Sequence, residues 1–436
     1  MDPAIVVGLT SVIGILLLVY LGMHVAIALA LVSGLALLAH SGSLILPVRL
    51  AVLAATDGVS SYSFGVVPLF ILMGILVGHA DLGRDAFRVA HAAVGRIRGG
   101  LGIATVLANA VFAAITGISI ASAAIFSRVA VPEMRRFGYS KQFATGVVAG
   151  SSILGMLMPP SVLLIVYAIV AQQSVAAMFR AAILPAILLA TLFSVGILIM
   201  TRLTPGFVQP GFNPAAERGP KLGAWQSMSL SGPILLLIVM VMGGIYGGVF
   251  TPTEAGAAGA TLALLIVIAK RRFSVAMLWA SLVESGRLTA SILFLIICAT
   301  MYSRMLGVTG LPYMLTEWLR EIEVGFVQLM ILYCVLMILL GMILDSTSTM
   351  LILIPIFLPT ALAFGADPVW FGIITVLGAE IGLLTPPLGI SVFVVKDAIR
   401  DPDTTLGDIF RGAFPFAAMM ALMLALLVMF PGLTRW

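Results

Sequence analysis

Gly155-Met156-Leu157-Met158-Pro159-Pro160 and Gly382-Leu383-Leu384-Thr385-Pro386-Pro387 share one pattern, Gly-x-x-x-Pro-Pro, and each interrupts an apolar segment of membrane length. One copy lies in each half of the chain. A double proline cannot continue a helix, because neither residue donates an N–H and each ring clashes with the preceding turn. Within a bilayer the freed carbonyl groups need partners, so such breaks line cavities inside the protein. Paired breaks in corresponding halves indicate the binding site of a secondary transporter.

Composition places the chain in a membrane. Its 436 residues are 61% hydrophobic and only 9% charged, whereas soluble domains carry about 25% charged residues. The basic residues behind the net charge of +5 are scattered between apolar segments, so no nucleic-acid surface is indicated.

Other sequence features exclude several roles. Cys298 and Cys334 lie inside apolar stretches and are expected to be small buried hydrophobes. The N-terminus lacks the basic region and cleavage site of a signal peptide. Without an HExxH or GxGD motif, an intramembrane enzyme is not predicted.

Apolar segments predict ten spans and two hairpins, since a span needs about 20 mostly apolar residues. The predicted spans are 4–20, 22–40, 64–80, 142–170, 180–201, 230–248, 255–270, 288–308, 369–396 and 411–430. The segments 100–130 and 327–365 carry small polar residues at their centres, and we predict re-entrant helical hairpins whose tips stop near the midplane. The amphipathic stretches Arg84 to Arg98 and Ser274 to Arg287 are predicted to be arms along the membrane surface.

The distribution of Lys and Arg predicts the orientation, because cytoplasmic loops are enriched in both. With both termini in the periplasm, 18 of the 23 basic residues fall in cytoplasmic segments: 81–99, 127–141, 202–229, 270–287 and 396–411. Residues 1–201 and 230–436 then contain the same order of spans, arm, hairpin and broken span, but with opposite orientation. Residues 202–229 are the predicted cytoplasmic linker. Inverted repeats with broken helices recur among secondary transporters.

Two further motifs carry a family resemblance. They are Gly243-Gly244-Ile245-Tyr246-Gly247-Gly248-Val249-Phe250-Thr251-Pro252-Thr253-Glu254-Ala255 and Gly378-Ala379-Glu380-Ile381-Gly382-Leu383-Leu384-Thr385-Pro386-Pro387-Leu388-Gly389. Both resemble signatures of the large membrane subunit of tripartite ATP-independent periplasmic (TRAP) transporters, and the resemblance covers essentially the whole chain. It implies an all-α polytopic membrane protein: an inverted-repeat, elevator-type secondary transporter with two re-entrant hairpins and two broken helices.

The same resemblance implies the function and the partners. We expect sodium-driven uptake of a small organic acid, commonly a carboxylate, across a bacterial inner membrane, with Na⁺ as the coupling ion and no other cofactor. The implied partners are the lipid bilayer, a soluble periplasmic binding protein that delivers the substrate, and a small four-helix membrane subunit. The alternative is a self-sufficient sodium-coupled anion carrier of related architecture that needs no binding protein.

Sodium prefers oxygen ligands, including carbonyl groups released where a helix stops, so one site is predicted where each hairpin tip faces a break. The first set of candidates is Ser119, Ser122, Gly150, Ser151 and Met158, and the second is Asp345, Ser346, Thr347, Gly378 and Thr385. At Gly378 the family frequently has Asn, so only a backbone carbonyl can serve there. The serines have an alternative role as hydrogen-bonding groups between or within helices.

Several other residues are candidates with two interpretations each. A carboxylate at membrane depth costs about 2.5–3.5 kcal/mol, so Asp345 is predicted to bind or stabilise sodium, or else to cap a helix or form an ion pair. Arg304 is expected to hold an anionic substrate, to pair with a carboxylate or to reach the interface. Glu254 is predicted either to take part in gating or to be an ordinary carboxylate in the first turn of a helix, where the helix dipole favours negative charge. The remaining substrate candidates are Ser161, Gly389 and Ser391, and the remaining gating candidates are Glu380, Pro159, Pro160, Pro386 and Pro387.

Overall fold

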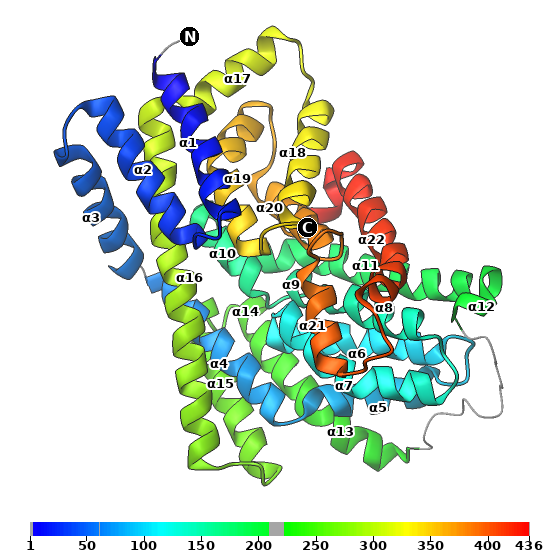
Figure 1. Cartoon of the computed structure of the whole chain (residues 1–436). Helices are drawn as coiled ribbons and strands as arrows, with labels where there is room; N and C mark the ends of the chain where they lie inside the picture. Colours follow the sequence, from blue (N-terminus) through cyan, green and yellow to red (C-terminus); the bar gives the residue numbers. More distant parts are fainter. Residues whose placement is uncertain (1–2, 61, 209–221, 436) are drawn as a thin grey trace.

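The computed structural model describes residues 3–60, 62–208 and 222–435, and within these ranges the regular structure is helical (Figure 1). An all-α fold follows from the composition, because only helices satisfy every backbone group inside lipid without a closed barrel. The first half contains α1 (Pro3–Tyr20), α2 (Val25–Ser41), α3 (Ile45–Ser60), α4 (Val66–His79), α5 (Leu82–Val94), α6 (Gly100–Thr116), α7 (Ser119–Arg136), α8 (Lys141–Ser152), α9 (Leu154–Leu157), α10 (Val162–Val170), α11 (Val175–Leu203) and α12 (Pro205–Val208).

The second half repeats much of this order. It contains α13 (Ala224–Ile238), a π-helical segment Val239–Gly243, α14 (Gly244–Tyr246), α15 (Pro252–Ala269), α16 (Val275–Thr309), α17 (Leu311–Glu321), α18 (Phe326–Gly341), α19 (Ser346–Ala363), α20 (Pro368–Gly382), α21 (Ile390–Ile399) and α22 (Leu406–Met429). Both predicted hairpins are present, as α6–α7 and α18–α19. The polytopic all-α class is therefore confirmed.

Membrane-length helices account for most predicted spans. Among the described residues, six helices are long and apolar enough to cross a membrane, and counting two bent helix pairs as single spans gives eight. One bent pair is the predicted broken span 142–170, whose two parts meet at 42°. The predicted spans 4–20 and 22–40 fall on the shorter apolar helices α1 and α2, and the predicted broken span 369–396 covers the short apolar helix α20, the second break and most of α21.

The two double prolines, Pro159-Pro160 and Pro386-Pro387, are 227 residues apart in the sequence, and we call this separation the repeat offset. The same separation recurs in both hairpins and both breaks. The first residues of α7 and α19, Ser119 and Ser346, are one repeat offset apart, and so are those of α8 and α20. Both Pro-Pro peptide bonds are cis. The predicted linker 202–229 falls partly on residues 209–221, which lie outside the described ranges, so the boundaries of the two halves stay a prediction.

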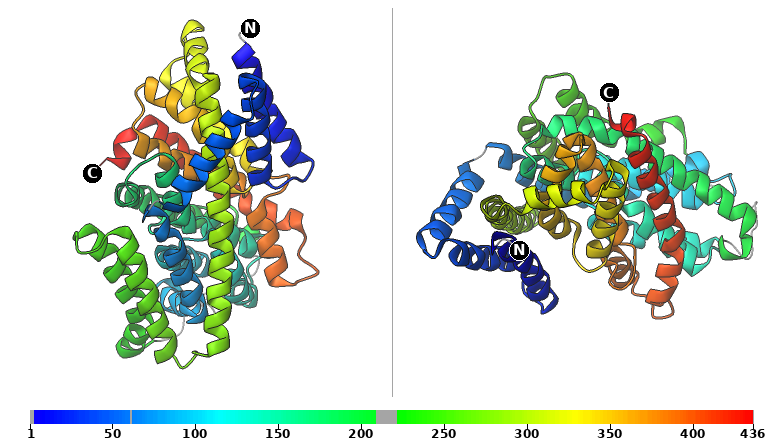
Figure 2. Two further views of the ribbon diagram at one scale, coloured as in Figure 1. Left: turned by 90° about the vertical axis from the view of Figure 1, so that its left-hand side faces the viewer. Right: turned by 90° about the horizontal axis from the view of Figure 1, so that it is seen from above.

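The second predicted arm is not a separate helix. Ser274 caps α16, and the stretch up to Arg287 is the first part of that single 35-residue helix, about 50 Å long. Figure 2 shows α16 running along much of the molecule. No proline interrupts α16, whereas α4 and α5 meet at 64° around Asp81, whose φ of +58° ends helical geometry. The segment between the first two spans and α4, where no span is predicted, contains α3.

Glycines allow α8 and α22 to cross backbone to backbone. A Cβ added to Gly412 would lie 1.8 Å from the Gln142 carbonyl oxygen, and one added to Gly146 would lie 2.1 Å from the Gly412 carbonyl carbon. One turn further along α8, Gly150 faces Phe416 in the same way, with 2.4 Å between the added Cβ and the Phe416 Cβ. Small residues at this spacing let membrane helices approach closely. The crossing holds α8, the first part of one break, against α22.

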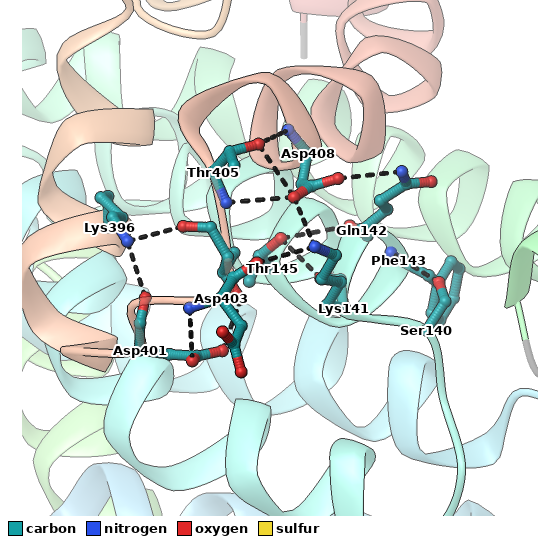
Figure 3. A network of polar contacts seen from close by, with 11 residues as sticks. Ser140, Lys141, Gln142, Phe143, Thr145, Lys396, Asp401, Asp403, Thr405 and Asp408 are labelled. Carbon is teal, nitrogen blue, oxygen red and sulfur yellow. Dashed lines mark hydrogen bonds and ion pairs between the residues drawn. The ribbon is translucent and has the colours of Figure 1, made fainter.

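A polar network connects α8 and α22 at their first turns (Figure 3). Lys141 Nζ lies 2.8 Å from Asp408 Oδ2, and Gln142 Nε2 donates to Asp408 Oδ1 at 3.0 Å. Thr405 forms a capping box with Asp408 at the start of α22. The loop before it is held by Lys396 Nζ, which donates to the carbonyls of Asp401 and Thr404 at 2.6 Å each.

Hydrogen bonds within that loop stabilise a charged carboxylate. Thr404 Oγ1 donates to Asp401 Oδ2 at 2.6 Å, and the Asp403 N–H donates to Oδ1 at 3.0 Å. These two bonds lower the pKa of Asp401 below its ordinary value. The loop between α21 and α22 is therefore ordered by its own ionised side chain.

Candidate functional site

The first hairpin tip lies directly on the first break. Gly117, with φ of +63°, turns the chain between α6 and α7, and a Cβ there would lie 2.4 Å from the Pro160 carbonyl oxygen. The Val162 N–H donates to the Gly117 carbonyl at 3.2 Å. From the other side, a Cβ on Gly155 would lie 2.9 Å from the Ser119 nitrogen. The predicted apposition of tip and break is therefore present in the first half.

The second tip lies on the second break in a similar way. A Cβ on Gly382 would lie 2.4 Å from the Gly341 carbonyl carbon, so the end of α18 touches the end of α20 through backbone. The Leu388 N–H, just after the double proline, donates to the Met342 carbonyl at 3.3 Å. In each half, one N–H that follows the prolines is thus bonded to a carbonyl of the hairpin turn.

Glu380 connects the two tips. Its side chain on α20 is 0% exposed, and Ser346 Oγ, at the start of α19, donates to its Oε1 at 2.7 Å. The Ser119 hydroxyl at the start of α7 lies close to the same carboxyl but forms no hydrogen bond with it. Since helix N-termini carry partial positive charge, two hairpin helices present favourable ends to one carboxylate.

Six buried oxygen atoms around the tips and breaks have no hydrogen-bond partner among the described residues, and each belongs to a side chain that is 0% exposed. They are Asn109 Oδ1, Ser119 Oγ, Ser122 Oγ, Thr349 Oγ1, Glu380 Oε2 and Ser391 Oγ. Buried polar groups are nearly always hydrogen-bonded, so a set of exceptions calls for an explanation. Carboxylate, amide and hydroxyl oxygens are the ligands that hard cations take. Oxygen atoms of these kinds are chemically suited to a dehydrated cation.

Some candidate hydroxyl groups are already bonded. Ser151 Oγ accepts from Asn109 Nδ2 at 2.6 Å. Thr385 Oγ1 donates to the Ile381 carbonyl at 2.8 Å, within its own turn. Ser161 caps α10 by accepting from the Leu164 N–H at 3.3 Å, and it donates to the Met156 carbonyl at 2.5 Å. Met158 is the extended residue that ends α9.

The structure places Asp345 as the cap of α19. Its Oδ2 accepts from the N–H groups of Thr347 and Ser348 at 3.1 Å each, and the Ser348 hydroxyl donates to its Oδ1. The side chain is exposed rather than buried. It lines a cavity of about 310 Å³ together with Thr347 and with His24 from the cap of α2. The geometry of Asp345 is therefore that of a helix cap, which is one of its predicted alternatives.

Four candidates face other elements. Gly150 faces α22, and Gly378 faces Met337 of α18 with 3.2 Å between the added Cβ and the Met337 Cβ. Glu254 is exposed and completes a capping box with Thr251 at the start of α15. Arg304 forms an ion pair with Asp57 on α3, which lies at the edge of the molecule (Figure 2).

Sequence reasoning misses two site residues. Thr349 follows Ser122 by the repeat offset, so applying that spacing to the first tip finds it. Asn109 lies in the middle of α6 and has no counterpart at that spacing, since Leu336 stands there.

The predicted substrate candidate Gly389, with φ of +60°, comes just before α21, and a Cβ on it would lie 2.6 Å from Phe410 Cε1.

Together, the fold and the paired breaks define a polytopic membrane transporter. A family model described as the DctM component of tripartite ATP-independent periplasmic transporters matches residues 12–433. The chain is 34% identical over 377 residues to the C4-dicarboxylate TRAP transporter large permease protein DctM of Pseudomonas aeruginosa, covering 86% of this chain and 85% of that protein. It is 31% identical over 428 residues to the sialic acid TRAP transporter large permease protein SiaM of Vibrio cholerae, covering 97% and 96%.

This chain belongs to the DctM family of TRAP transporter large permease subunits, and the resemblance predicted from the two motifs is confirmed. The structure is also similar to that of the Alcanivorax borkumensis YdaH transporter. The TM-score is 0.61 at 16% identity, covering 85% of this chain and 86% of that one, so the likeness is of fold.

Proposed function

We propose that this permease subunit takes up a small organic anion of the carboxylate class together with sodium. The observation that carries the proposal is the set of six unpartnered, fully buried oxygen atoms at the tips and breaks. A carboxylate substrate is supported by the names of two relatives, which are permeases for C4-dicarboxylates and for sialic acid. Helix N-termini at the tips favour an anion nearby.

The proposal includes the partners and the setting. A soluble periplasmic binding protein delivers the substrate, and a small four-helix membrane subunit supports the permease in the bacterial inner membrane. Both termini lie in the periplasm. Hairpins and broken helices move together as an elevator, which is supported by the backbone contacts between each tip and its break.

Uptake in proteoliposomes tests the sodium site. The vesicles contain the permease and its small subunit, and the binding protein loaded with labelled substrate is added outside. Replacing both unpartnered tip serines, Ser119→Ala with Ser122→Ala, is expected to raise the half-saturating sodium concentration at least about tenfold, because two proposed hydroxyl–sodium contacts are lost, each comparable to a hydrogen bond of about 1 kcal/mol. Ser231→Ala is the matched control, since the Ser231 hydroxyl bonds the Ser227 carbonyl of its own helix.

Unchanged sodium dependence of the double variant, at wild-type thermal stability, would remove the tip serines from the site. Uptake of free substrate without any binding protein would favour the self-sufficient carrier. Asp345 needs a separate comparison, because it caps α19. Asp345→Ser keeps a capping oxygen but removes the charge. If the charge serves sodium, both Asp345→Ser and Asp345→Ala abolish uptake; if only the cap matters, Asp345→Ser retains it.

A further inference from the structure

A cavity of about 500 Å³ lies between α5 and α7, outside the site described above. Four arginines line it, two from each helix: Arg84, Arg88, Arg128 and Arg136. Among the lining residues in the described part of the chain, Glu133 is the one carboxylate. Guanidinium groups bind phosphate through paired hydrogen bonds, so the wall has the chemistry of a phosphate site.

Nearby carboxylates neutralise only part of this charge. Asp85 on α5 is paired with Lys270, and Asp81 accepts from Arg272 at 3.1 Å. The same Asp81 oxygen also forms a longer ion pair with Arg84, at 3.8 Å, and so offsets part of the charge of that arginine. The four arginines therefore leave a local excess of positive charge around one glutamate.

The same cavity has a second, independent feature. His91 on α5 lines it, is 6% exposed, and has an Nε2 atom without a hydrogen-bond partner among the described residues. A buried ring nitrogen that is left unpaired is unfavourable, and a phosphate oxygen can accept a hydrogen bond from the N–H of a neutral imidazole. The rings of Phe87 and Phe137, with Val129, supply an apolar wall beside the charged one.

We propose that this cavity binds the phosphate headgroup of an anionic phospholipid, with the glycerol and acyl part against Phe87 and Phe137. The apolar wall favours a lipid over free phosphate. The position of the cavity also favours a lipid. It lies beside α5, the amphipathic helix predicted to lie at the cytoplasmic surface, where basic pockets between helices hold anionic headgroups. Since α5 belongs to the predicted arm and α7 to the first hairpin, the headgroup links the two.

Binding to the purified full chain tests the proposal without any transport measurement, so its failure is distinguishable from failure of the sodium-coupled function. The chain is placed in phosphatidylcholine nanodiscs with increasing phosphatidylglycerol, and native mass spectrometry and thermal unfolding report the lipid bound. Arg88→Gln with Arg128→Gln is expected to weaken phosphatidylglycerol binding by on the order of tenfold or more, because each basic group near an anionic surface contributes about fivefold.

Arg271→Gln is the control, a basic residue that does not line the cavity, and it is expected to bind like the wild type. Arg88→Lys with Arg128→Lys tests paired hydrogen bonding at constant charge, and serves if the glutamine variant does not fold. Equal binding by the wild type and the glutamine variant overturns the site. Protection by inorganic phosphate alone, equal to that by phosphatidylglycerol, overturns the lipid assignment.

Discussion

Gly117 carries two separate constraints, and these can be measured apart. Its φ of +63° disfavours any L side chain, and a Cβ would lie 2.4 Å from the Pro160 oxygen. Gly42 has a similar φ of +65° with nothing within 4 Å of an added Cβ. Gly42→Ala is expected to lose only the conformational cost, about 1–2 kcal/mol. Gly117→Ala should lower the thermal unfolding midpoint further and also abolish uptake; equal effects would mean that the tip and the break are not in contact.

Glu380 offers a test of charge at constant shape. Glu380→Gln keeps an acceptor for the Ser346 hydroxyl, so folding is expected to survive, while the acidic group beside the tips is lost. We expect sodium-dependent uptake to fall at least tenfold, which corresponds to about 1.4 kcal/mol. Glu284→Gln, an exposed residue of α16, controls for the substitution itself. Wild-type uptake by Glu380→Gln would reduce this residue to a structural role.

At the residue scale, sequence reasoning identifies the region better than the individual atoms. It singles out Ser119, Ser122, Ser391 and Glu380, and the structure shows an unpartnered oxygen on each. It also names Gly150, whose Cα face packs against Phe416 of α22, because a glycine beside a break also serves helix packing. No spacing rule distinguishes these two uses, since the partner helix lies in the other half of the chain.

The crossing of α8 and α22 predicts opposite effects for one substitution at two helical glycines. Gly412→Ala would place a Cβ 1.8 Å from the Gln142 oxygen, so the helices must separate; we expect a loss of about 1–3 kcal/mol. Gly307 on α16 has open space around an added Cβ, and Gly307→Ala is expected to gain roughly 0.5–1 kcal/mol. Thermal unfolding of both purified variants checks the pair. A neutral Gly412→Ala would contradict the close crossing.

At the element scale, both hairpins and both breaks are predictable, because a polar tip or a double proline leaves a local mark. The continuity of α16 cannot be predicted in the same way. Its first part, up to Arg287, is amphipathic like an arm, and amphipathic periodicity does not tell a bent pair from a straight helix. The difference lies in the backbone at the junction. Asp81 leaves helical geometry between α4 and α5, and no residue does so within α16.

For the whole molecule, the arrangement of basic residues predicts both termini in the periplasm. A cysteine-free background, Cys298→Ala with Cys334→Ala, receives single cysteines at Ser43→Cys or Arg96→Cys. An impermeant maleimide added to spheroplasts is expected to label position 43 and to reach position 96 only after the membrane is opened. The reverse pattern would invert the orientation, the assignment of each hairpin to a face, and the cytoplasmic setting of the lipid cavity.

Glu380 also bears on how the chain arose. The position one repeat offset before it is Ile153, so the carboxylate that meets both tip serines exists in one half only. If a gene duplication produced the chain, its two copies at first carried the same residue at both places. The loss or gain of a single acid then made the two copies differ at this place. Neither half, paired with a twin of itself, rebuilds a centre with one buried acidic side chain.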